Sequence, residues 1–151
     1  MKTFTAGQFK NEKFFTADMK ERFSNHFVKF VESGFKRELF YQWFYERLTN
    51  LFGMIAHHNR EGFYETFFTT AARQLRFVDA LVEWGYKDDL EGILTAWLLT
   101  SRIPAQIERL RDLDEEAQER AMLAYLLQKY DGKPVSPELL PDEEQLPPAL
   151  L

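Results

Sequence analysis

The sequence predicts an all-α protein, a single helical bundle of about five helices followed by an extended C-terminal tail rich in proline and leucine. Apolar residues recur at spacings of three and four through most of the 151 residues. No stretch alternates apolar and polar residues between hairpin turns. Five of the six prolines lie beyond residue 132. We therefore expect a bundle domain over residues 1–132, beginning with an extended arm over 1–15, and a tail over 133–151.

The first two helices are predicted from their apolar stripes and from the residues that flank them. Thr16 is a suitable N-cap for the first helix, and Gly34 is a natural end. The second helix is predicted over residues 35–58, because a broad apolar surface marks a central helix. The stripes are Met19, Phe23, Phe27, Phe30 and Val31 in the first helix, and Phe40, Phe44, Leu48, Leu51 and Ile55 in the second.

The remaining helices are delimited in the same way. Asn59 can cap a third helix that ends at Gly85, with apolar residues at spacings of four, four, four, three and four. Asp88 and Glu91 resemble a capping box that opens a fourth helix, which Pro104 breaks or kinks. A fifth helix is predicted from Asp114 to about Tyr130. The third stripe consists of Phe63, Phe67, Ala71, Leu75, Val78 and Val82.

Aromatic residues and charge are unevenly distributed along the chain. Twenty of the 24 aromatic residues precede residue 86, so the N-terminal part forms a thick core or presents apolar surface to a partner. The net charge is −5 overall, but +2 up to Gly85 and −7 beyond it. Neither part contains a concentrated run of basic residues, so direct nucleic-acid binding is not expected.

Several classes of chemistry are excluded by the composition. The chain has no cysteine, which excludes disulfides, thiolate metal sites and a cysteine nucleophile. It has no phosphate-binding glycine loop and no serine in a nucleophile elbow. We expect no catalytic residue and no cofactor. The longest run without a charged residue, Leu48–Asn59, is too short to cross a bilayer, and the N-terminus lacks the apolar block of a signal peptide. A soluble, cytoplasmic protein is therefore expected.

Histidines, one tryptophan and leucines of the tail are the candidate binding residues. His26 and Trp43 lie near the phenylalanine stripes, where they could contact a ligand or partner. His57 is four residues before Glu61, and Glu65 follows one turn later, so these three could ligate iron, manganese or zinc. Capping and solvent-facing roles are the ordinary alternatives for such residues. In the tail, Leu139, Leu140 and Leu146 could dock into a groove or cover the chain's own bundle.

One resemblance to a known family arises from these segments. The pattern resembles the opening helices of the TenA and heme-oxygenase-like superfamily over about 40 residues. The proline usual after the first histidine is missing, and no complete ligand set carries over. The segments are His26–Val28, Glu32–Gly34, Leu39–Tyr41, Trp43, Ala56–His57 and Gly62–Glu65. The resemblance implies a small helical-bundle enzyme or carrier that binds a ligand or metal.

Three hypotheses for function follow. The first is a non-enzymatic protein–protein interaction module that self-associates or binds a partner through an aromatic-rich surface. The second is the small ligand- or metal-binding bundle implied by the resemblance. The third is an acidic accessory or inhibitor protein that binds a basic surface of nucleic-acid machinery through the acidic C-terminal part.

Overall fold

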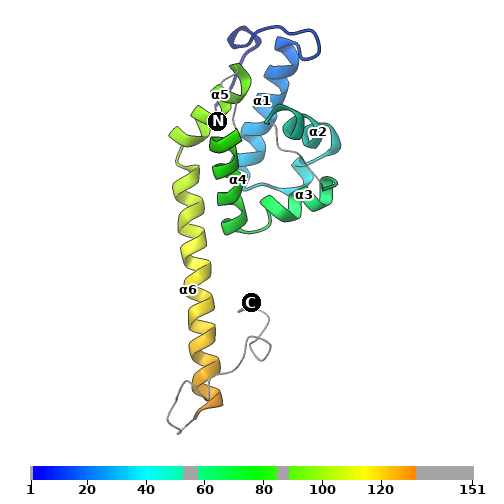
Figure 1. Ribbon diagram of the computed structural model, residues 1–151. Coiled ribbons are helices and arrows are strands. Elements are labelled where there is room, and N and C mark those ends of the chain that lie inside the picture. The colour runs from blue at the N-terminus through cyan, green and yellow to red at the C-terminus, as the bar shows by residue number, and fades with distance from the viewer. Residues whose placement is uncertain (1, 53–57, 85–88, 132–151) are drawn as a thin grey trace. The chain divides into compact units, whose positions relative to one another are not determined.

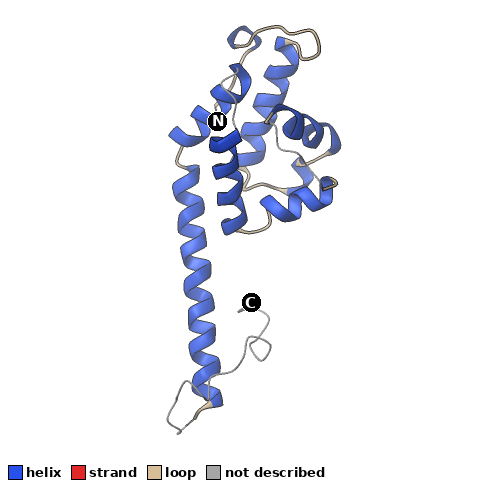
Figure 2. Cartoon of the chain, viewed as in Figure 1, coloured by secondary structure: helices blue, strands red, loops and turns tan. Residues whose placement is uncertain are grey.

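The computed structural model describes residues 2–52, 58–84 and 89–131 and confirms the all-α prediction. In these ranges there are six α-helices and two short 3-10 helices, and no strand (Figures 1 and 2). The elements are η1 (Ala6–Gln8), α1 (Ala17–Glu32), η2 (Arg37–Leu39), α2 (Gln42–Leu51), α3 (Arg60–Phe67), α4 (Ala71–Trp84), α5 (Asp89–Thr100) and α6 (Ile103–Lys129). The chain divides into two compact units, residues 1–108 and 109–151. The expected tail over 133–151 lies outside the described residues.

The unit of residues 1–108 is organised around phenylalanine. Thirteen of the fifteen phenylalanines are buried and belong to one continuous apolar cluster. Phe30 is typical, since its ring lies 5.0 to 5.5 Å from four other phenylalanine rings and meets each of them edge to face. Of the two alternatives that the sequence left open, a thick core is therefore the one the structure supports.

The first helix, α1, follows the sequence prediction closely. The Thr16 hydroxyl accepts a hydrogen bond from the Met19 amide at 3.2 Å, so Thr16 is the N-cap. Its predicted stripe faces the core, with Phe23, Phe27 and Phe30 fully buried. Ser33 is the last residue with helical backbone angles, and Gly34 follows with φ of 81°.

The end of α1 is a Schellman motif that places an aromatic residue in the left-handed conformation. The amide of Gly34 donates to the carbonyl of Val31 at 3.1 Å, and that of Phe35 donates to Phe30 at 3.0 Å. Phe35 has φ of 61°, which is a costly backbone conformation for a bulky side chain. Its ring is buried against Phe30 and Phe68, and Tyr64 Oη donates to its carbonyl at 2.5 Å. Burial and hydrogen bonding together offset the strain.

This turn corrects the prediction of one helix over residues 35–58. After the left-handed Phe35 the chain cannot continue as an α-helix, so it forms η2 and only then α2. The predicted positions Phe40, Phe44 and Leu48 are buried as expected. Residues 53–57, at the predicted end of the helix, lie outside the described residues.

The prediction of one continuous third helix is wrong. Asn59 caps its start, because Asn59 Oδ1 accepts from the Gly62 amide at 2.7 Å. However, α3 ends at Phe67 and a new helix begins at Ala71. The side chain of Thr70 accepts a hydrogen bond from the Arg73 amide at 3.2 Å and so caps α4. Breaking the helix here lets both Phe68 and Phe77 enter the core, with their ring centroids 4.8 Å apart.

One helix ends and another begins just before Pro104, as the prediction of a break there expected, but the segment after Pro104 differs from the prediction. It is the second residue of α6, where its missing N–H needs no partner. From there α6 continues without a break through Asp114, which was the predicted start of a separate helix. Ile107 belongs to the core of residues 1–108. No helix among the described residues is long and apolar enough to span a membrane.

An almost fully buried lysine joins the N-terminal arm to two helices. Lys20, on α1, is only 2% exposed, and its ammonium group lies 2.9 Å from Glu12 and 2.8 Å from Asp89. Asp89, the first residue of α5, also accepts hydrogen bonds from the amides of Lys10 and Leu90. Burial alone would lower the pKa of Lys20, but the hydrogen bonds to both carboxylates outweigh it and raise that pKa. The same contacts hold the pKa of Asp89 below its usual value despite burial.

The two glycine positions Gly34 and Gly92 are expected to respond oppositely to alanine. A Cβ would meet nothing within 4 Å at either position, so backbone conformation alone decides. Gly34→Ala should lower the free energy of unfolding by about 1 kcal/mol or more, because its φ is positive. Gly92→Ala, inside α5, should raise it by about 0.5–1 kcal/mol. Urea unfolding of both variants measures the difference, and equal effects would contradict this account of the turn.

Lys20→Met should destabilise the protein by about 3 kcal/mol, because it leaves buried carboxylate charge without its cation. Glu12→Gln is the matched control. Glu12 is half exposed, so this change should cost less than about 1 kcal/mol. Because the pKa of Asp89 is lowered on folding, its contribution should disappear as the pH falls below about 4. Chemical denaturation across pH measures each of these effects, and a Lys20→Met variant as stable as the Glu12→Gln variant would refute the role of Lys20.

Candidate functional site

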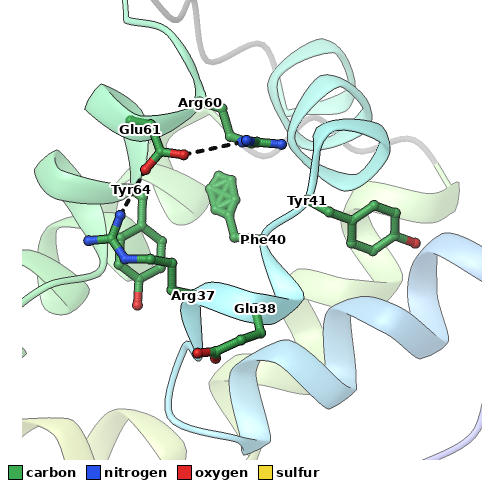
Figure 3. Close-up of a pocket in the computed structure, with 7 residues that line it drawn as sticks. All are labelled: Arg37, Glu38, Phe40, Tyr41, Arg60, Glu61 and Tyr64. Carbon is green, nitrogen blue, oxygen red and sulfur yellow. Dashed lines mark hydrogen bonds and ion pairs between the residues drawn. The ribbon is translucent and has the colours of Figure 1, made fainter.

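A polar pocket lies between η2 and the first turns of α3. It has a volume of about 260 Å³. Figure 3 shows the carboxylate of Glu61 between the guanidinium groups of Arg37 and Arg60, with the ring of Phe40 beside them. The lining residues are Arg37, Glu38, Phe40, Tyr41, Arg60, Glu61 and Tyr64.

Both arginines of this pocket form ion pairs with Glu61. Arg37 binds Glu61 at 2.8 Å and Glu65 at 3.1 Å, and its guanidinium lies 4.4 Å from the centre of the Tyr64 ring. Burial raises the pKa of Tyr64, although Arg37 opposes that effect, so the hydroxyl stays protonated and donates to Phe35. The pocket therefore fastens α3 to the turn after α1, and its charges nearly balance.

The hypothetical metal ligands are not brought together among the described residues. Glu61 and Glu65 lie one turn apart on α3, as the sequence predicted, but both carboxylates face Arg37. His57 lies outside the described residues. Within residues 2–52, 58–84 and 89–131 there is no group of three or more His, Cys, Asp or Glu side chains able to hold a metal ion.

His26 is held by the backbone and by aromatic rings. Its Nε2 lies 2.7 Å from the carbonyl oxygen of Leu39, so Nε2 carries a proton and donates to that oxygen. The rings of Tyr41 and Phe44 contact it edge-on at 5.0 and 4.7 Å. Burial lowers the pKa of His26, and the charges of Lys29 and Arg22 lower it further against the effect of the hydrogen bond. His26 thus fixes the end of η2 against α1.

Trp43 is half-buried, and the guanidinium groups of two arginines lie near its ring. The guanidinium of Arg22 is 4.4 Å from its ring, that of Arg47 is 5.5 Å away, and Tyr41 stacks beside it at 6.3 Å. Tyr41 contacts both His26 and Trp43, so the structure brings these two predicted residues into one cluster. The other three predicted contact residues, Leu139, Leu140 and Leu146, lie outside the described residues.

A second candidate surface, on α6, was missed by the sequence reasoning. Leu110 and Leu113 are each 54% exposed, Leu123 is 57% and Leu127 is 64% exposed. Leu110, Leu113, Ala117, Ala124 and Leu127, together called the leucine face here, follow the three-and-four spacing of a coiled-coil seam, with Arg120 at the remaining position. That spacing was present in the sequence, but dividing the segment at Asp114 concealed it.

Comparison of the chain with family models, with curated proteins and with solved structures gives no match. The resemblance to the TenA and heme-oxygenase-like superfamily therefore gains no support from them.

The ring of His26 is expected to titrate below pH 6.5, because burial disfavours its charged form. The unfolded chain then takes up a proton at higher pH than the folded chain, so the free energy of unfolding should fall as the pH drops below 6.5. NMR titration of the ring protons measures the pKa directly. His26→Gln keeps a donor for Leu39 and should reduce the pH dependence of stability in this range. A titration midpoint at or above 6.5 would contradict the account.

Proposed function

We propose that this chain is a non-enzymatic protein–protein interaction module that makes contact through the leucine face of α6. The observation that carries the proposal is the exposure of this helix. Between Arg109 and Lys129 no side chain is buried, and only Arg111, Met122, Tyr125 and Leu126 are half-buried. All three leucines of the leucine face are more than half exposed, as is Leu123 outside it.

Physical considerations support a partner for this helix. In proteins most of the stability of a helix comes from the tertiary packing of its apolar face rather than from intrinsic helix propensity. Leucines at seam spacing have no solvent-facing role, since charged or polar residues would be more soluble there. A protein partner that covers the face would supply the missing packing.

The contact surface differs from the one that the composition suggested. Most of the phenylalanines lie in the core, so the aromatic surplus of the N-terminal part is accounted for by folding. The proposed contact is instead made by the aliphatic side chains of the leucine face, in the acidic C-terminal part of the chain. The metal-dependent alternative is weakened because Glu61 and Glu65 bind Arg37. The hypothesis of a basic partner stays a prediction.

A photo-crosslinking residue on α6 tests the proposal in cells that produce the protein. Leu113→p-benzoylphenylalanine should form crosslinks to protein chains, because this position lies on the leucine face. Glu115 is the matched control, since it is exposed on the same helix about 200° away around the axis. Crosslinking from position 113 but not from 115 is the expected result. Equal yields at both positions, or none at either, would overturn the proposed function.

A further inference from the structure

We infer that the leucine face binds a second copy of this chain, with the two α6 helices antiparallel and crossing between Gln118 and Glu119. The inference rests on the proposed function and names the partner. It follows from the order of side chains along the face, which is self-complementary when one copy is reversed.

Reversal about this centre pairs each contact layer with a suitable layer of the other copy. Leu110 lies opposite Leu127, Leu113 opposite Ala124, and Ala117 opposite Arg120. Antiparallel coiled coils pair a and d positions across the interface in this manner, and facing large and small side chains interdigitate. The leucines then close both ends of the interface, while each Arg120 near the middle faces the small side chain of Ala117.

A parallel pair lacks this fit. In the parallel arrangement each residue faces its own counterpart, so Ala124 meets Ala124 and leaves a gap between flanking layers. Arg120 would meet Arg120 inside the seam, and like charges placed directly opposite are destabilising. In the antiparallel arrangement Arg120 of one copy lies next to Glu116 of the other. Arg120 also pairs with Glu116 on its own helix at 2.5 Å, so two cations and two anions gather at the centre.

The charges on the rest of the helix favour the same arrangement. Residues 109–116 carry six charged side chains, whereas residues 121–128 carry none. Antiparallel pairing places the charged segment of each copy opposite the uncharged segment of the other. Parallel pairing places the acidic groups of 112–116 opposite themselves, which costs Coulomb energy. The antiparallel orientation therefore avoids the repulsion between acidic segments that the parallel orientation would create.

Disulfide trapping tests the orientation directly, because the natural chain contains no cysteine. Two full-length variants are prepared, Leu113→Cys and Ala124→Cys. A mixture of the two should form a disulfide-linked dimer on mild oxidation, and each variant alone should form far less. Glu115→Cys mixed with Met122→Cys is the matched control, since these positions share the register but lie on the opposite side of the helix. Faster crosslinking of Leu113→Cys with itself than in the mixture would overturn the antiparallel assignment.

Sedimentation equilibrium of the unmodified chain tests association itself. The mass should rise with concentration from 17.9 kDa toward twice that value. Leu113→Glu should weaken the dimer about tenfold or more, because it places a charge in an apolar layer. Circular dichroism confirms that the variant keeps its helices. A monomer at every concentration would overturn the inference.

Two further outcomes separate this inference from other occupants of the face. If the unmodified chain is monomeric but a Leu139→Ser, Leu140→Ser, Leu146→Ser variant dimerises, the chain's own tail covers the face and the inference is wrong. If position 113 crosslinks to a different protein while the purified chain stays monomeric, the inference fails and the proposed function stands. If position 113 crosslinks to nothing, both fail.

Discussion

The turn that follows α1 is the constraint on which the fold of residues 1–108 depends. Gly34 and Phe35 both take the left-handed conformation, and the Phe35 ring enters the core as the chain reverses. Its carbonyl receives the Tyr64 hydroxyl from α3, and its ring contacts Phe68 and Phe77, the latter on α4. The strained residue Phe35 at the end of α1 thus helps to position α3 and α4. The strain persists because these contacts hold Phe35 in its left-handed conformation.

Phenylalanine dominates the core, and some of the helices around it are short. Helices such as α2 and α3, of ten and eight residues, present few turns to the core, so each buried position must cover a large area. Rings that meet edge to face also add directional attraction. Eight large apolar side chains are exposed among the described residues, and four of them are leucines of α6.

Sequence reasoning succeeded where several local signals agreed and failed where a tertiary contact decided the structure. For α1 the cap at Thr16, the stripe and Gly34 all agree, and its bounds were predicted well. The spacing of apolar residues alone predicted one helix running past Phe68. The helix is interrupted there because Phe68 is buried in the core and Thr70 caps a new helix. No sequence pattern marks Lys20 as buried, because its partners Glu12 and Asp89 lie outside α1, in the N-terminal arm and on α5. The leucine face can be recognised only when α6 is taken as one continuous helix. Pro104 and the acidic residues from Asp114 onward instead suggested a break.

The arm before α1 is part of the folded core rather than an appendage. Phe4, Phe9 and Phe15 are buried, whereas the residues between Phe9 and Phe15 are exposed. Two lysines, Lys10 and Lys13, lie in that exposed stretch, where a trypsin-like protease could reach them. Cleavage there would detach two core rings and cut the backbone next to the amide that binds Asp89. A single nick in a solvent-accessible loop would thus act on the stability of the whole unit and shorten the lifetime of the protein.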